Sequence, residues 1–360
     1  MKIATEVKGY ITVPPPADMT YAPYDIAVAL TSGLVERGHE VDFFAPEGSR
    51  LGKGTLVTLG QPALVKSQQE YSDALFNIGY HSHNTLALYD QNYAAEMFRR
   101  ARKDEYDVLH FHQPEPALAY VKDYPDVPVV YTMHDPISPE AAERLRAYHT
   151  DNAWVVSVSD HQRTLAPDLH YAATVYNGID TDLFSFAGDK DDYLLFAARL
   201  IPEKGLKEAV EVARMTNQKL VILGQKYPDH EAYFQKYVEP YLGEQIRYEG
   251  YVPHQQAIPY FQKAKAFLMP IAWDEPFGLT MVEALSCGTP VIAFNRGAVP
   301  EIIVDGVTGY IVKNVQEMAE AVGKIDAIDL QACRDHVVAN FSVDKMVRGY
   351  EAVYEKIRVC

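Results

Sequence analysis

One stretch of the chain, residues 274–293, decides the fold, and it reads DEPFGLTMVEALSCGTPVIA. Pro276 suits the entrance of a helix, because a proline has no N–H to lose there. Gly288 suits the residue just past the helix end, and Pro290 prevents the helix from continuing. The apolar residues 291–294 are typical of a buried parallel strand. The stretch therefore predicts a loop, a short helix and a buried strand in succession.

Two carboxylates frame this predicted helix. Glu275 precedes it and Glu283 lies on it, with seven residues between them. The expected helix start, at Phe277, Gly278 and Leu279, offers unpaired N–H groups and the positive end of a helix dipole, which together favour an anion. A ligand that carries both a diphosphate and sugar hydroxyls would use the helix start and the two carboxylates.

The stretch resembles the E-x7-E signature of retaining glycosyltransferases of the GT-B fold, the large group 1 family, also called family 4. Residues 295–303 (NRGAVPEII) and 305–312 (DGVTGYIV) resemble the continuation of that family's pattern. Two solvated glutamates beside a helix would explain an isolated pair, but they explain the long ordered match poorly. The resemblance implies retention of anomeric configuration and no essential metal.

Length and composition predict a two-domain globular protein. The chain has 360 residues, more than a single core usually holds. Its net charge of −16 argues against a nucleic-acid partner and gives no general attraction to anionic membranes. Three widely spaced cysteines form neither a disulfide framework nor a metal-binding spacing and favour a reducing cytoplasm. Residues 1–8 are too short and too charged for a signal peptide, and no run approaches the ~20 apolar residues of a membrane span.

Strand and helix signals alternate in both halves of the chain, which predicts parallel sheets covered by helices. The first half has expected helices at 24–37 and 94–102. Strands are expected at 2–7, 39–45, 107–111, 127–133 and 154–158, and then at 193–197, 219–223, 246–248, 266–270, 291–294 and 310–312.

We therefore predict an α/β protein of the GT-B class, with two Rossmann-like doubly wound domains and a cleft between them at the carboxyl ends of both sheets. Residues 1–180 would form the acceptor-side domain and residues 181–342 the nucleotide-sugar domain. The tail, 343–360, is expected to be a helix, and the resemblance implies that it crosses back to the first domain.

Residues 196–205, FAARLIPEKG, are the second strong signal. A strand ends there, and Arg199 and Lys204 follow in the loop, where two cations can hold a diphosphate. The family pattern has an arginine and a lysine at these positions. The alternative is that both cations pair on the surface with Glu203 and Glu208.

Three histidines lie on or directly after two strands of the first half. His134 follows a strand at the position of the family's cleft histidine, which contacts the donor sugar. His110 and His112 would lie on one face of another strand, as a metal pair could. No third ligand is apparent, so a pair that lines the cleft or packs in the core is favoured, and no metal site is expected.

The loop that opens the first helix departs from the family. Many members have a Tyr-Gly-Gly-x-Glu sequence, where this chain has Tyr21-Ala22-Pro23-Tyr24-Asp25. Alanine and proline lack the backbone freedom of two glycines, and proline also lacks an N–H. The first domain's donor contact is thus expected to differ, with an unusual acceptor pocket.

The resemblance implies a retaining glycosyltransferase that moves a hexose or N-acetylhexosamine from a nucleotide-diphosphate sugar to a glycan or small-molecule acceptor. Arg199, Lys204 and the helix start would neutralise the departing diphosphate. Glu275 would bind the sugar hydroxyls and oppose the oxocarbenium-like charge, and Glu283 would bind the ribose hydroxyls. His134 would position the sugar from the other domain.

The expected partners are a UDP- or GDP-linked sugar and a saccharide or small-molecule acceptor. We expect no separate cofactor, no nucleic acid, no indicated membrane association and a cytoplasmic location. Two alternatives stay open: a GT-B sugar-nucleotide epimerase, and a non-catalytic sugar-nucleotide-binding subunit. The altered loop at 21–25 favours the non-catalytic subunit, whereas intact Arg199, Lys204 and Glu275 oppose it.

Overall fold

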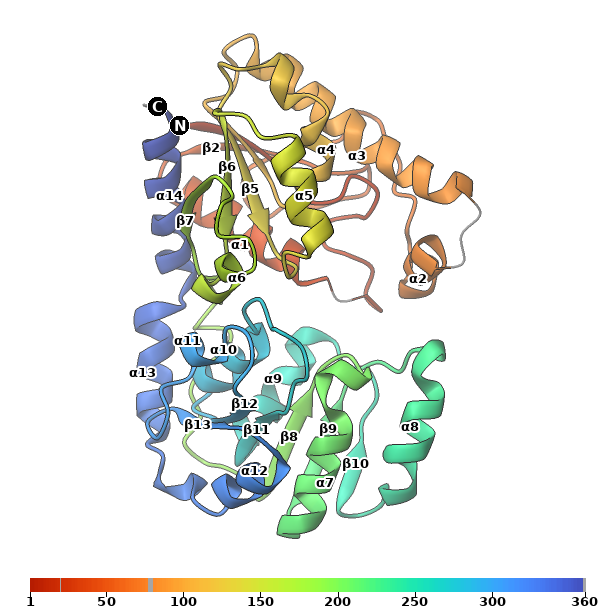
Figure 1. Ribbon diagram of the computed structural model, residues 1–360, viewed down its shortest axis with the longest axis vertical. Helices are drawn as coiled ribbons and strands as arrows, with labels where there is room; N and C mark the ends of the chain where they lie inside the picture. Colours follow the sequence, from red (N-terminus) through yellow and green to blue (C-terminus); the bar gives the residue numbers. More distant parts are fainter. Residues whose placement is uncertain (20, 77–79, 359–360) are drawn as a thin grey trace. The chain divides into compact units, whose positions relative to one another are not determined.

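The structure is a computed structural model and describes residues 1–19, 21–76 and 80–358 (Figure 1). The chain forms two compact units. The first consists of Met1–Gly178 together with Val343–Cys360, and the second consists of Ile179–Ser342. In Figure 1 the first unit is the one that holds both labelled ends of the chain.

The first unit is built on a parallel sheet of seven strands in the order β3-β2-β1-β4-β5-β6-β7. Strands β4, β5 and β6 are buried along their whole length, as expected for apolar strands covered on both faces. The strands are β1 (Lys2–Glu6), β2 (Glu40–Phe44), β3 (Thr55–Val57), β4 (Val108–Phe111), β5 (Val129–Met133), β6 (Ala153–Ser157) and β7 (Tyr171–Thr174). Its helices are α1 (Ala22–Glu36), α2 (Gln68–Phe76), α3 (Tyr80–Ala101), α4 (Glu115–Leu118), η1 (Val121–Asp123), α5 (Pro139–Ala147), α6 (Asp160–Thr164) and α14 (Val343–Arg358).

The second unit has a six-stranded parallel sheet in the order β10-β9-β8-β11-β12-β13. The strands are β8 (Tyr193–Ala197), β9 (Lys219–Leu223), β10 (Ile246–Tyr248), β11 (Ala266–Met269), β12 (Val291–Phe294) and β13 (Gly309–Val312). The longer helices are α7 (Leu206–Thr216), α8 (Glu231–Tyr237), α9 (His254–Lys263), α10 (Leu279–Ser286), α11 (Val299–Ile302), α12 (Val315–Val322) and α13 (Leu330–Asn340). Short 3-10 turns are η2 (Pro202–Lys204), η3 (Pro228–His230), η4 (Glu239–Tyr241) and η5 (Ile325–Ala327).

These two parallel sheets confirm the predicted α/β class with two Rossmann-like domains. Each expected strand is present within two residues at either end. The helix predicted over 94–102 was too short, because α3 begins at Tyr80. Its buried stripe includes Leu86, Asp90 and Tyr93. A buried carboxylate in that stripe breaks the apolar periodicity by which a helix is recognised.

The chain after β1 turns into α1 through the loop that departs from the family pattern. Tyr21 caps α1, and Pro23 lies in its first turn, where a missing N–H costs no helical hydrogen bond. The buried Tyr24 hydroxyl donates to the backbone oxygens of Lys8, at 2.7 Å, and Ile11, at 3.0 Å. One side chain of α1 therefore fixes the loop that follows β1.

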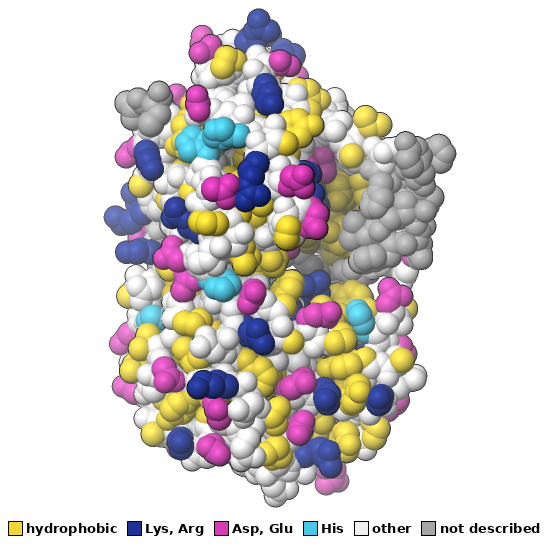
Figure 2. All heavy atoms as spheres, viewed as in Figure 1, with side chains coloured by type: hydrophobic (Ala, Val, Ile, Leu, Met, Phe, Trp, Pro, Cys, Tyr) yellow, Lys and Arg dark blue, Asp and Glu magenta, His cyan; other side chains and the backbone are white. Residues whose placement is uncertain are grey.

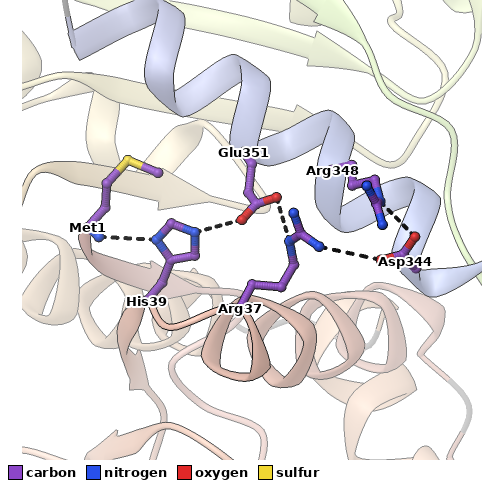
Figure 3. Close-up of polar contacts among 6 residues, drawn as sticks. All are labelled: Met1, Arg37, His39, Asp344, Arg348 and Glu351. Atoms are coloured by element: carbon purple, nitrogen blue, oxygen red, sulfur yellow. Dashed lines mark hydrogen bonds and ion pairs between the residues drawn. The ribbon is translucent and has the colours of Figure 1, made fainter.

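Helix α14 packs against α1 and β7 of the first unit. Its inward face is apolar and aromatic, with Met346, Tyr350 and Tyr354 all buried. A row of polar contacts follows the outer edge of the same helix (Figure 3). The side chains in that row are Arg37, His39, Asp344, Arg348 and Glu351, with the amino group of Met1 at one end. The exposed ion pairs of Asp344 contribute little, whereas the shielded contacts of Glu351 with Arg37 and His39 add to the buried apolar face in docking α14.

The described residues include charged side chains of both signs on the visible surface. On the face drawn in Figure 2, Lys and Arg side chains are interspersed with Asp and Glu. Among the described residues, no helix has both the length and the apolar character needed to span a lipid bilayer.

Candidate functional site

Lys204 and Glu275 form a largely buried ion pair at the carboxyl edge of the second unit's sheet. The Lys204 Nζ lies 2.7 Å from Glu275 Oε2, and the two side chains are only 12% and 11% exposed. Lys204 follows β8, and Glu275 follows β11, which pairs directly with β8. Because adjacent parallel strands end at the same edge, residues 71 positions apart meet there.

Trp273 completes this cluster, and the sequence had not indicated it. Its indole Nε1 donates to Glu275 Oε2 at 2.8 Å. The Lys204 ammonium lies 4.3 Å from the centroid of the Trp273 ring, and the Arg199 guanidinium lies 5.8 Å from it. The indole therefore holds both predicted cations near the carboxylate through ring–cation attraction.

The pKa of Lys204 is lowered from its usual value, mainly by burial. Burial lowers the pKa of its ammonium, the nearby Glu275 carboxylate raises it, and Arg199 lowers it further. The predicted alternative, surface pairing with Glu203 or Glu208, is not what the structure has for Lys204. Its ion pair is with Glu275, and Arg199 has no ion-pair partner among the described residues.

Glu275 lies in the loop before helix α10, which begins four residues later at Leu279. Gly278 caps it with φ = 93°, a left-handed conformation. A Cβ on Gly278 would lie 2.4 Å from Met281 Cε and 3.4 Å from Glu275 Cγ. Phe277 is 2% exposed and its ring packs edge-on against Phe341. A ligand contact from Phe277 would therefore have to come from its backbone.

Glu283 lies inside α10 and is 4% exposed. Its Oε1 lies 2.7 Å from Nε2 of His254, the first residue of α9, whose side chain is 40% exposed. This pairing could not be predicted, because no spacing rule links the start of α9 to the middle of α10. The two predicted carboxylates therefore have different partners. Glu275 pairs with Lys204, and Glu283 pairs with His254.

The backbone of Glu275 is held by the loop after β12. The amide of Ala298 donates to the Glu275 carbonyl oxygen at 2.9 Å. Gly297 has φ = 56°, and a Cβ there would lie 2.3 Å from both the backbone N and O of Glu275. Only glycine therefore fits between this loop and Glu275.

We expect Gly297→Ala to displace Glu275 and to lower turnover strongly, because the added methyl meets backbone that cannot move aside. Gly250→Ala is the matched control: it has φ = 81° but open space within 4 Å of the added methyl. Both variants bear the left-handed cost of about 1–2 kcal/mol, which thermal unfolding reports. Equal activities for the two variants would contradict the role of this contact.

His134 belongs to the first unit, where it follows β5. Its Nε2 lies 2.8 Å from Nδ1 of His112, the residue after β4, and the two rings stack with centroids 5.1 Å apart. The His110 ring stacks on that of His112, with centroids 4.3 Å apart. Both nitrogens of His110 are occupied, by the hydroxyls of Thr132 and Tyr354. The pair predicted at His110 and His112 is therefore packed, and the described residues hold no group of three metal ligands.

All three imidazoles are held neutral by burial. Burial lowers the pKa of His110 to about 3 and that of His134 to about 4, and it lowers the pKa of His112 well below its usual value. At neutral pH each ring therefore carries one N–H and one bare nitrogen.

Further polar groups that the sequence analysis missed lie near the end of β1. Glu6 is 1% exposed, and neither carboxylate oxygen has a hydrogen-bond partner among the described residues. Burial, followed by the charge of Asp90, raises its pKa well above the usual value. Lys8 Nζ donates to Gln113 Oε1 at 2.8 Å, and Asp90 Oδ1 accepts from the Gly9 amide at 2.6 Å. Glu6 could have been identified from the sequence, because it is a charged residue at the end of a predicted buried strand.

The predicted site residues thus fall into two groups. Arg199, Lys204 and Glu275 lie together in the second unit, with Glu283 on the adjoining helix α10. His134 lies in the first unit, beside His112.

The fold is of the GT-B class, and two family models match consecutive parts of the chain. "Glycosyltransferase Family 4" matches residues 26–183, and "Glycosyl transferases group 1" matches residues 181–332. The chain belongs to this family of glycosyltransferases.

Several curated proteins are similar to the chain. An uncharacterized 41.2 kDa protein in the cps region of Klebsiella pneumoniae is 32% identical over 45% of this chain and 46% of its own length. A glycogen synthase of Mycobacterium tuberculosis is 29% identical over 56% of this chain and 55% of its own length. The chain thus spans about half the length of these two relatives. An N-acetyl-alpha-D-glucosaminyl L-malate synthase of Bacillus anthracis is 23% identical over 91% of this chain and 92% of its own length.

Solved structures share the fold at low identity. AviGT4, a glycosyltransferase involved in avilamycin A biosynthesis, has a TM-score of 0.70 and 20% identity, over 99% of this chain and 98% of its own. Sucrose-phosphate synthase from Thermosynechococcus elongatus has a TM-score of 0.75 and 18% identity over the whole of both chains. Anabaena HepE, in complex with UDP and glucose, has a TM-score of 0.68 and 16% identity, over 99% of this chain and 100% of its own.

Proposed function

We propose that the protein is a retaining glycosyltransferase that moves a hexose or N-acetylhexosamine from a nucleotide-diphosphate sugar to a saccharide or small-molecule acceptor. One observation carries the proposal: the buried Lys204–Glu275 pair, with Trp273 and Arg199 around it, stands directly before helix α10. Cations, a carboxylate and the N-terminal end of a helix in one place suit a ligand that is both phosphorylated and hydroxylated.

The cations would stabilise the leaving group. A departing diphosphate gains negative charge as its bond to the sugar breaks, and preorganised positive groups stabilise that charge most where water is excluded. Lys204 is buried and already oriented by Glu275, so little reorganisation would be needed during the reaction. Arg199 would supply a planar fork of donors to the same phosphates.

Glu275 would bind the transferred sugar. Both of its protein hydrogen bonds, from Lys204 and Trp273, go to Oε2. Oε1 would therefore accept from sugar hydroxyls, and the ionised carboxylate would oppose the positive charge that develops on the sugar ring. We propose that the leaving phosphate oxygen takes the acceptor's proton on the same face, which gives retention without a protein base or a divalent cation.

Glu283 would bind the ribose hydroxyls, with its Oε1 oriented by His254. Glu283→Gln should weaken nucleotide binding about tenfold to a hundredfold, because a hydrogen bond to a charged group contributes about 1.5–3 kcal/mol. Titration calorimetry with UDP and GDP measures the effect, and Glu211→Gln, at an exposed position on α7, is the matched control. Equal affinity of Glu283→Gln and the control would rule out the ribose role.

A screen of nucleotides and nucleotide sugars by thermal shift, followed by nucleotide release with candidate acceptors, tests the proposed function. UDP-linked sugars come first, since HepE was solved with UDP and glucose. Activity should persist in EDTA, and NMR of the product should show retained anomeric configuration. An epimer formed without acceptor would indicate an epimerase, and tight donor binding without turnover would indicate a binding subunit.

A further inference from the structure

The hydrogen bond between His112 and His134 has only two possible directions. Both rings are neutral, so one nitrogen of the close pair must carry the hydrogen and the other must accept it. Either His112 Nδ1–H donates to His134 Nε2, or His134 Nε2–H donates to His112 Nδ1 across the 2.8 Å separation. Each direction fixes the tautomer of both rings at once.

The second nitrogen of His112 distinguishes the two directions. Its Nε2 is buried and has no hydrogen-bond partner among the described residues. If His134 donated, this Nε2 would carry a buried N–H without an acceptor, which is rare and costly in native structures. If His112 donates, Nε2 is a bare nitrogen, and an unpaired acceptor is better tolerated. The surroundings of His112 therefore favour the arrangement in which His112 is the donor.

His112 is also held firmly in its orientation. Its ring stacks on that of His110, with centroids 4.3 Å apart, and lies nearly parallel to the ring of His134, to which it is hydrogen-bonded. His110 cannot turn easily, because the hydroxyls of Thr132 and Tyr354 engage its two nitrogens at 2.7 and 2.8 Å. The Thr132 hydroxyl is itself 2.8 Å from that of Tyr350. The tyrosines of α14 thus support the stack on which His112 rests.

We propose that His112 is a positioning residue that holds His134 as the Nδ1–H tautomer. His134 then offers a hydrogen-bond donor to an oxygen of the bound substrate, and it does not act as a base. This N–H suits a hydroxyl or phosphate oxygen of the ligand, which can accept the hydrogen bond. The substrate contact rests on the proposed glycosyl transfer, whereas the tautomer of His134 does not depend on it.

Nitrogen-15 NMR of the histidine rings tests the tautomer directly in the ligand-free protein. The expected spectrum has a protonated Nδ1 and a bare Nε2 on His134. His112→Asn keeps an amide N–H close to the position of Nδ1 and should leave this spectrum unchanged. His112→Gln, which places its amide near Nε2 instead, and His112→Leu should give a mixture of His134 tautomers. A wild-type His134 with its hydrogen on Nε2 would overturn the proposal.

Kinetics adds a second readout if the protein transfers sugar. His112→Gln and His112→Leu should lower kcat about tenfold, the effect of one misplaced hydrogen bond, and leave the Kd of the free nucleotide unchanged. His112→Asn should restore kcat, and a result as poor as that of His112→Leu would overturn the proposal. Thermal unfolding of each variant identifies any that do not fold. Absence of transfer in the wild type would refute the proposed function alone, because the NMR result decides the tautomer.

Discussion

Lys204→Met is expected to lower kcat about 10²- to 10³-fold, because it removes a preorganised positive charge from a water-poor site. Methionine keeps most of the apolar stem of the side chain but cannot neutralise a departing diphosphate. The measurement is the rate of nucleotide release at saturating donor. Lys207→Met is the matched control, since Lys207 is exposed on α7 only three residues further along.

The same variant has an effect on folding that must be measured beside the rate. Removal of Lys204 leaves the Glu275 carboxylate, 11% exposed, with the Trp273 indole as its remaining side-chain donor among the described residues. Loss of one partner of a buried pair commonly destabilises a protein by about 3–5 kcal/mol. Rates should therefore be taken well below the melting temperature of the variant. A folded Lys204→Met protein with wild-type turnover would refute the role of this lysine in transfer.

Asp90→Asn is expected to stabilise the protein at pH 8 by about 4 kcal/mol. Burial raises the pKa of Asp90 to about 7, from an ordinary value of 3.8, although Lys8 and the Gly9 amide lower it. Asparagine is neutral at every pH and keeps an oxygen that can accept from the Gly9 amide. The substitution therefore removes the cost of a buried charge without removing the hydrogen bond.

The sign of the pH dependence follows from proton binding. Below pH 3.8 both the folded and unfolded forms hold the Asp90 proton, and between pH 3.8 and about 7 only the folded form does. The free energy of unfolding of the wild type therefore falls as pH rises through this window, by about 1.4 kcal/mol per unit. Above pH 7 the loss is constant. The advantage of Asp90→Asn should grow across the window and then level off.

Denaturant unfolding at several pH values measures this advantage as a difference between two proteins. The difference matters because the buried histidines act in the opposite direction. The pKa of His134 is lowered to about 4, so the unfolded chain binds its proton first and stability falls as pH drops below 6.5. That contribution cancels between wild type and variant. Asp126→Asn, at an exposed position, is the control, and a pH-independent difference for Asp90→Asn would contradict the prediction.

The sequence could predict the elements whose signal is local. Strands of the second unit were predictable because β8, β11 and β12 are apolar along their whole length and end at polar loops. The positions of Arg199, Lys204 and Glu275 at one sheet edge followed from the same pattern. Parallel strands end together, so residues that follow them meet.

Side-chain partners that depend on the tertiary fold could not be predicted. His254 reaches Glu283 from the start of α9, and the Trp273 indole donates to the carboxylate of Glu275, two residues further along. In the sequence alone, no spacing distinguishes His254 or Trp273 from a residue whose side chain is exposed to solvent. The burial of Asp90 could not be predicted either, because a carboxylate in a helix normally indicates a solvent-exposed position.

The order in which the chain is made has a consequence for how it folds. The second unit is one continuous segment, whereas the first unit is completed only by α14, which follows the whole of the second unit in the chain. Until then, His110 and Thr132 have no tyrosine hydroxyls to meet, and the face of the sheet that α14 covers stays open to water. The second unit can therefore complete its folding first, and the first unit must wait until α14 has been synthesised.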